Sequence, residues 1–251
     1  MKTLWRIKKY FADLIDTFPY LGLSYKIPFL YNLIAASDFP YFFSKQELSD
    51  IICAESLKKN SIVLDLACGT GEFSFWLANQ QKDIHVIGID SAESMLECAQ
   101  KKAIEEKVEN VSFFCQLIEK LTKDDIEQHI KEQKLEHDSL SMIVNCFGFS
   151  AMRNFEQGFN QALSILPEKS IFCIVDVYRK PSVINYICNF FYDNLLFGAD
   201  SFRIVYLQMK QQMDQFELYE KKNVPDPLLI YSTITPYIAK GVKKAETMKG
   251  N

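Results

Sequence analysis

Residues 62–78 read IVLDLACGTGEFSFWLA, and this stretch decides the fold of the chain. It begins with a short apolar run, of the kind that lies buried in a parallel sheet, and carries Asp65 near the end of that run. The glycines of Cys68-Gly69-Thr70-Gly71 tolerate positive φ and let backbone N–H groups approach a ligand. Apolar residues then recur at helical spacing, so we expect a helix from about Glu72. A strand, a glycine turn and a helix N-terminus form a site for a nucleotide or an anionic group, because unpaired N–H groups point into the crevice.

The spacing of this motif separates three kinds of nucleotide site. The phosphate-binding pattern G-x-x-x-x-G-K-[ST] is absent. A dinucleotide fingerprint would require glycine at Ser74 and would place the Asp65 carboxylate beside a pyrophosphate. S-adenosylmethionine has no phosphate, but it has an ammonium and a sulfonium group, so an acid at the strand end suits it. Residues 65–71 resemble the first motif of the class I S-adenosylmethionine-dependent methyltransferases, which is commonly written D-x-[GA]-x-G-x-G.

A second apolar strand supports this resemblance. It spans His85 to Asp90 and ends in a carboxylate about 20 residues past the turn, where a βαβ nucleotide fold places the acid that binds both ribose hydroxyls. Ser91 is a candidate N-cap for the next helix, and Met95 lies on the buried face of that helix. The alternative is that Asp90 is only a strand-end acid. With two motifs in register, the resemblance implies S-adenosylmethionine as the cofactor.

The resemblance also implies the fold class and a domain order. We expect an α/β fold: a Rossmann-like, doubly wound sheet of about seven strands with a reversed last strand, plus helical N-terminal and cap segments. The expected parts are a helical N-terminal lid or extension (1–45), a cofactor-binding core (46–180), a helical cap insertion (181–213), the closing antiparallel strands of the core (214–241) and a flexible tail (242–251).

Composition excludes several functional classes. The net charge is −4 with acids and bases interspersed, so we expect no nucleic-acid partner. The seven cysteines form no C-x-x-C pair, which predicts small buried hydrophobes in a reducing cytoplasm rather than disulfides or a metal site. No signal peptide is visible and no apolar stretch reaches membrane-spanning length. We therefore expect a soluble, cytoplasmic protein.

Two segments rich in aromatic and aliphatic residues flank the expected core. For residues 1–45 three interpretations remain: a packing helix over the sheet, a lid over the substrate, or a less favoured membrane-surface contact. Residues 181–212 are apolar nearly all round, where many small-molecule methyltransferases build a substrate cap, and weakly resemble the quinone-biosynthesis methyltransferases. These segments favour a hydrophobic small molecule as the substrate.

The loop after the third expected strand, Val111 to Cys115, departs from the family pattern. Related methyltransferases often carry an aspartate there, which accepts a hydrogen bond from the adenine amino group. Register places Leu117 at that position, with Gln116 beside it. We expect Leu117 to pack on the adenine and the Gln116 amide to replace the lost acceptor.

Candidate catalytic residues follow the fourth and fifth strands, but no dedicated base is evident. The segment Asn145-Cys146-Phe147-Gly148 replaces the [DNS]-P-P-[YFW] signature of nucleic-acid amino methyltransferases, which argues against methylation of nucleic-acid bases. Asn145 could form a pocket wall or serve only as a structural strand-end residue. Asp176 and Tyr178 end the fifth strand, and His137 precedes the fourth. A further histidine, His129, lies in a charged segment and is expected at the surface.

The sequence thus predicts a methyltransferase that transfers the methyl group of S-adenosylmethionine to a hydrophobic small molecule. Two alternatives remain: a cofactor-binding regulatory module with little turnover, and a protein methyltransferase. The acceptor atom, the substrate and the oligomeric state are left open. The residues expected to contact the cofactor are Asp65, Ala67, Cys68, Gly69, Thr70, Gly71, Asp90, Ser91, Met95, Gln116, Leu117 and Asn145.

Overall fold

The computed structural model describes most of the predicted core. The described residues are 43–53, 57–136, 139–149, 152, 155–179, 201–221 and 234–245. Nearly all of the predicted N-terminal lid, residues 181–200 of the predicted cap insertion, and His137 lie outside the described residues.

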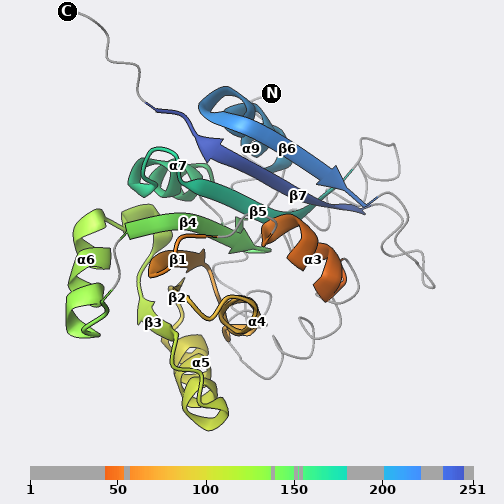
Figure 1. Cartoon of the computed structure of the whole chain (residues 1–251). Coiled ribbons are helices and arrows are strands. Elements are labelled where there is room, and N and C mark those ends of the chain that lie inside the picture. Colours follow the sequence, from red (N-terminus) through yellow and green to blue (C-terminus); the bar gives the residue numbers. More distant parts are fainter. Residues whose placement is uncertain are drawn as a thin grey trace, which may run out of the picture.

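The core is a sheet of seven strands in the order β3-β2-β1-β4-β5-β7-β6 (Figure 1). The first five strands pair in parallel, whereas β7 runs antiparallel to both β5 and β6. This arrangement confirms the predicted doubly wound sheet with a reversed last strand. The strands are β1 (Ser61–Leu66), β2 (Ile84–Asp90), β3 (Val111–Cys115), β4 (Ser139–Cys146), β5 (Ile171–Arg179), β6 (Met213–Glu220) and β7 (Ile234–Lys243).

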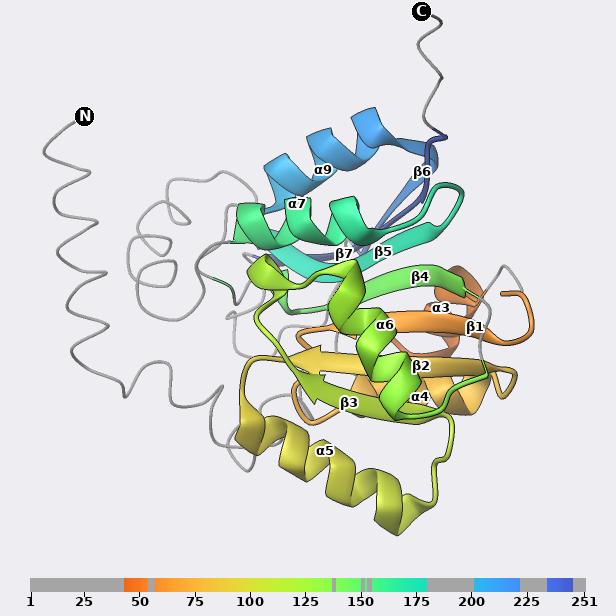
Figure 2. The same cartoon turned by 90° about the vertical axis from the view of Figure 1, so that its left-hand side faces the viewer.

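Helices cover both faces of the sheet. Buried side chains of α3, α4 and α5 pack on one face, and those of α6, α7 and α9 pack on the other. Figure 2 shows α6, α7 and α9 succeeding one another over the face turned to the viewer. The helices are α3 (Lys45–Ile52), α4 (Glu72–Gln80), α5 (Glu93–Glu106), α6 (Lys123–Glu132), α7 (Phe155–Ile165) and α9 (Ser201–Gln212), with a short 3₁₀ turn, η2 (Ile118–Lys120).

Strand β1 lies inside the sheet, between β2 and β4, and all its residues are buried. Val63 joins the cluster that contains Trp76 of α4, whereas Leu64 joins the cluster that contains Phe159 of α7. A strand covered on both faces needs apolar residues at successive positions, because its side chains alternate between the two faces. The unbroken apolar run in the sequence has this cause.

The closing strands differ in extent from the sequence-based expectation. The expected bounds are 214 and 241, whereas β6 begins at Met213, directly after α9, and β7 continues to Lys243. The Lys243 side chain explains the longer β7: its Nζ donates to the carbonyl oxygens of Leu163 at 2.8 Å and of Leu166 at 2.7 Å. These contacts satisfy carbonyl groups at the C-terminal end of α7 and fix the end of β7.

The expectation that His129 lies at the surface is wrong. His129 is buried on the sheet-facing side of α6, and its Nε2 lies 3.0 Å from Ser112 Oγ. The same hydroxyl lies 2.9 Å from Nε2 of His85, which is also buried. The imidazole of His129 packs on the Phe114 ring at a centroid distance of 4.7 Å. The histidine therefore belongs to the interface between α6 and the sheet.

The helices in the part of the chain that the structure describes are all too short or too polar to cross a membrane.

Candidate cofactor site

The turn after β1 is held against the end of β2 by backbone hydrogen bonds. Ala67, Gly69 and Gly71 adopt positive φ of 57°, 55° and 78°. The Cys68 N–H donates to the carbonyl oxygen of Ile89 at 3.0 Å, and the Gly71 N–H donates to the carbonyl oxygen of Cys68 at 2.9 Å. Gly71 is then the N-cap residue of α4. The chain therefore reverses tightly and presents the helix N-terminus at the carboxyl edge of the sheet.

Asp90 joins this turn to the start of α5. Its Oδ2 accepts from the Gly69 N–H and its Oδ1 accepts from the Ala92 N–H, both at 2.9 Å. Burial raises the pKa of the Asp90 carboxyl, although these backbone N–H groups oppose the shift. A carboxylate has about four acceptor positions, so two bonds leave capacity for hydroxyl groups of a ligand.

The prediction that Ser91 caps the helix is wrong. The N-cap of α5 is Ala92, whose side chain makes no capping bond, and Ser91 is exposed. The Asp90 carboxylate accepts the Ala92 N–H instead. Asp90, one residue before Ser91, thus accepts hydrogen bonds both from the glycine turn and from the start of α5.

Asp65 lies beneath the turn with only 1% of its surface exposed. The Ser74 hydroxyl donates to its Oδ2 at 2.5 Å. Burial raises the pKa of the Asp65 carboxyl to about 7, with the nearby Asp90 charge acting in the same direction. A positive charge at this edge of the sheet would favour the ionised form of Asp65.

Asn145 ties the loop after β4 to the end of β1. It is fully buried, and its Nδ2 donates to the carbonyl oxygen of Leu66 at 2.6 Å. Its Oδ1 accepts from the backbone N–H groups of Gly148 at 3.2 Å and Phe149 at 2.9 Å. Both ends of the amide are therefore engaged within the protein, which supports the structural interpretation of Asn145.

The loop after β3 lies beside Asp90. The Gln116 N–H donates to the carbonyl oxygen of Asp90 at 3.0 Å, and the Gln116 Oε1 accepts from the Leu117 N–H at 2.9 Å. Leu117 is 44% exposed. The structure thus places Gln116 and Leu117 next to Asp90, where the sequence predicts the contact with the adenine.

Three other predicted contact residues, Cys68, Thr70 and Met95, are buried at the base of the site. They help to pack the turn and the start of α5 against the sheet.

The remaining catalytic candidates lie toward the other end of the sheet. Asp176 of β5 is fully buried, and its Oδ1 accepts from the Val177 N–H at 2.8 Å. The Tyr178 hydroxyl donates to Oε1 of Glu220, at the end of β6. Burial, with the Glu220 carboxylate, raises the pKa of Tyr178 to about 12. Sequence reasoning missed Glu220, because an acid on a solvent-facing edge strand has no motif around it.

Among residues of the described ranges, no group of three or more histidine, cysteine or acidic side chains could hold a metal ion.

The sheet order, the glycine turn after β1 and the acid at the end of β2 together define a class I S-adenosylmethionine-dependent methyltransferase fold. A family model described as a methyltransferase domain matches residues 57–230. The chain therefore belongs to the methyltransferase family, whose members bind S-adenosylmethionine.

Relatives share shorter or more distant similarity. A carboxy-S-adenosyl-L-methionine synthase of Campylobacter hominis is 40% identical over 65 residues, which are 26% of this chain and 28% of that protein. The chain thus matches little more than a quarter of that relative's length. A phosphoethanolamine N-methyltransferase of Haemonchus contortus superimposes with a TM-score of 0.64 and 14% identity, covering 94% of this chain and 60% of the other. A geranyl diphosphate C-methyltransferase of Streptomyces coelicolor superimposes with a TM-score of 0.60 and 9% identity, and the match covers 80% of this chain and 78% of the other. These structures share the fold.

Proposed function

We propose that this protein transfers the methyl group of S-adenosylmethionine to a small hydrophobic molecule. The observation that carries the proposal is the Asp90 carboxylate, which joins the Gly69 N–H of the glycine turn to the Ala92 N–H at the start of α5. This geometry prepares one acid, at the carboxyl end of a parallel strand, for the two hydroxyls of a ribose.

The residues of this site suit the ribose and methionine portions of the cofactor. Asp90 would accept hydrogen bonds from the ribose diol, and the turn at Gly69 to Gly71 would lie under the ribose and methionine portion. Asp65 is nearly inaccessible, so its contribution would be electrostatic: its charge would attract the ammonium and sulfonium groups through the turn. Two acids and no basic side chain in this set suit a cationic ligand better than a pyrophosphate.

For methyl transfer the protein mainly has to align the acceptor with the methyl group of the cofactor. The sulfonium of the bound cofactor supplies a methyl group that is already activated toward a nucleophile. The residues of this chain would hold the ribose at Asp90, keep the turn in place through Asn145, and exclude water from the edge of the sheet. No dedicated base is required for an acceptor that is already nucleophilic.

The hydrophobic nature of the substrate is supported by the composition around the site. The aromatic segment 1–45 and the apolar segment 181–212 flank the core in the sequence. Within the described residues, Phe147 follows β4 at the same edge as the glycine turn and is partly buried against the core.

The proposal is tested first by binding. Asp90→Ala should weaken the affinity for S-adenosylmethionine by roughly tenfold to a hundredfold, because charge-assisted hydrogen bonds contribute about 1.5–3 kcal/mol. Titration calorimetry measures the change, with a thermal unfolding curve to show that the variant is folded. Asp50→Ala is the matched control, since Asp50 is exposed on α3 and accepts a hydrogen bond from the Gln46 side chain, away from the glycine turn. Equal affinity in wild type and Asp90→Ala would refute the assignment.

Turnover is tested with methyl-labelled cofactor. Purified protein is incubated with a lipophilic extract, and label should appear in an extractable small molecule. Label in protein would indicate the protein methyltransferase instead, and tight binding with no labelled product would indicate the regulatory module.

A second candidate function is modification of the cofactor itself. The 40% identity to a carboxy-S-adenosyl-L-methionine synthase over 65 residues favours it. Mass spectrometry of the cofactor after incubation with a carboxylic-acid co-substrate as the carboxyl donor separates the two: a methyltransferase yields S-adenosylhomocysteine, whereas a synthase of that kind would transfer the carboxyl group from the donor and yield a carboxylated S-adenosylmethionine.

A further inference from the structure

The carboxyl ends of three neighbouring strands, β1, β2 and β3, lie side by side at one end of the sheet. The glycine turn follows β1 and the ribose acid ends β2, so a ligand that continues in the same direction reaches the loop after β3. The hydrogen bond from the Gln116 N–H to the Asp90 carbonyl oxygen, at 3.0 Å, places this loop directly beside the ribose acid. The base of a bound nucleoside would therefore contact residues 115–117.

The backbone N–H groups of Gln116 and Leu117 and the Gln116 side chain are engaged within the protein. The Gln116 N–H is bonded to Asp90, and the Leu117 N–H donates to the Gln116 Oε1 at 2.9 Å. The Gln116 side chain also interacts with Asp125: hydrogen bonds from Thr122, with a smaller one from Gln116, hold the pKa of the Asp125 carboxyl below its ordinary value. The Gln116 amide thus links the loop to the start of α6, which differs from its expected role as an acceptor for the base.

The Leu117 side chain, which this loop exposes to solvent, is apolar. Leu117 is 44% exposed, although large aliphatic side chains usually lie inside. It stands at the position where the resembling family often has an aspartate. A leucine side chain can pack on the flat face of a purine, but it cannot accept a hydrogen bond from an exocyclic amino group.

We propose that this site recognises the base by apolar contact with Leu117 rather than by its hydrogen-bonding pattern, and so accepts purines with a 6-oxo group as well as a 6-amino group. The inference rests on the proposed cofactor function and concerns its specificity. A site that hydrogen-bonds a polar ligand group rejects the analogue without it by about 10⁴-fold or more, whereas apolar contacts discriminate by about 10²-fold at most.

The test compares S-adenosylhomocysteine with S-inosylhomocysteine, which differ in the base substituent. Calorimetry on the full chain should give a preference for the adenosyl compound of about a hundredfold or less in the wild type. Leu117→Asp should raise this preference by about tenfold or more, because a carboxylate accepts a bond from the 6-amino group and repels a 6-oxo group. Leu207→Asp is the matched control, since Leu207 is 52% exposed on α9, which packs at the opposite end of the sheet.

Each outcome separates the inference from the function on which it rests. A wild-type preference above about a hundredfold overturns the inference and leaves the cofactor assignment intact. An unchanged preference in Leu117→Asp, or an equal rise in Leu207→Asp, overturns the contact between Leu117 and the base. If neither compound binds the wild type, both the proposed function and the inference fail.

Discussion

Asp65 connects the buried core to the chemistry of the site. It is the acid of the first motif, yet the structure places it under the turn with the Ser74 hydroxyl as its partner. Burial raises the pKa of its carboxyl to about 7. Its charge state therefore responds to any cation that binds above it.

The first prediction concerns the pH dependence of stability. The folded chain holds the Asp65 proton up to pH about 7, whereas an unfolded chain releases it near pH 3.9. The folded state thus binds more protons between these values, and Asp65 lowers the free energy of unfolding as pH rises from about 4 to about 7, by on the order of 4 kcal/mol. Chemical denaturation at several pH values measures this. Asp65→Asn should remove the Asp65 contribution while keeping an acceptor for Ser74.

The same ionisation should affect cofactor binding. Because a bound cation favours the charged carboxylate, binding releases a proton and affinity for S-adenosylmethionine should rise as pH increases through about 7. Calorimetry in buffers of different ionisation enthalpy measures the proton release. Proton release of the same size in Asp65→Asn would show that another group is responsible.

Substitutions at two glycines test how closely the loop after β4 packs against the turn after β1. A Cβ at Gly148 would lie 2.3 Å from Asn145 Nδ2 and 2.6 Å from Ala67 Cβ, whereas at Gly158 it would meet the flexible end of Met152 at 2.5 Å. Gly148→Ala should destabilise the protein by about 1–3 kcal/mol. Gly158→Ala, inside α7, should be neutral or stabilising by up to about 1 kcal/mol. Thermal unfolding ranks the two, and the reverse order would contradict the packing described.

At the scale of elements, α6 shows how a polar helix is held on the sheet. A capping box at Thr122 and Asp125 fixes its start, and the buried His129 fixes its middle through Ser112. Burial lowers the pKa of His129, with only a partial counter-effect from Glu132. The side chains that contact His129 from the sheet are Ser112 and Phe114, and the Ser112 hydroxyl also contacts His85.

The docking of α6 should weaken in acid. In the unfolded chain the His129 pKa is about 6.5, and in the folded chain it is lower, so the folded state binds fewer protons as pH falls below about 6.5. The free energy of unfolding contributed by His129 should therefore decrease in that range. His129→Gln keeps a donor for Ser112 and removes the titration. The difference between the two stability curves isolates His129 from Asp65, whose contribution has the opposite sign.

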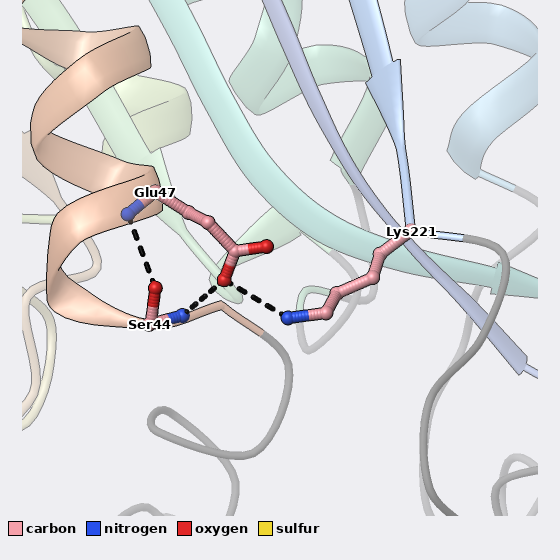
Figure 3. A network of polar contacts seen from close by, with 3 residues as sticks. All are labelled: Ser44, Glu47 and Lys221. Atoms are coloured by element: carbon pink, nitrogen blue, oxygen red, sulfur yellow. Dashed lines mark hydrogen bonds and ion pairs between the residues drawn. The ribbon is translucent and has the colours of Figure 1, made fainter.

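At the scale of the whole molecule, segments far apart in the sequence meet in one polar network. Glu47, in the capping box of α3, accepts from the backbone N–H of Ser44 and from Lys221 Nζ, which follows β6 (Figure 3). The Lys221–Glu47 distance is 2.9 Å, and both side chains are partly exposed. The hydrogen bonds from Ser44 and Lys221 lower the pKa of Glu47.

This ion pair should contribute little to stability. A double-mutant cycle with Glu47→Gln and Lys221→Met should give a coupling of about 0.5 kcal/mol and no more than about 1 kcal/mol, because exposed pairs are screened by water and salt. Glutamine preserves the capping box, so the cycle isolates the charge. A coupling above about 2 kcal/mol, or one unchanged by salt, would show that the network is a rigid anchor for α3.

Local pattern was enough to predict much of the site. The positions of Asp65, the glycine turn and Asp90 follow from apolar runs, glycine spacing and strand-end acids, which depend on neighbours in the sequence. The role of Ser91 was mistaken because a capping bond depends on which side chain reaches the N–H, and Asp90 reaches it first. The exposure of His129 was mistaken because a charged helix can still bury one polar side chain over a hydroxyl.

The sequence by itself determined the doubly wound sheet, its reversed last strand and the family, since the motif at residues 65–71 and the acid Asp90 carry the resemblance that implies them. Only the tertiary structure decided what the site residues do. It brought together Asn145 and Leu66, Gln116 and Asp90, and Tyr178 and Glu220. The two residues of each pair are distant in the sequence. Burial and hydrogen-bond partners are set by the packed chain as a whole, and these properties give Asp65 its raised pKa and leave Leu117 exposed.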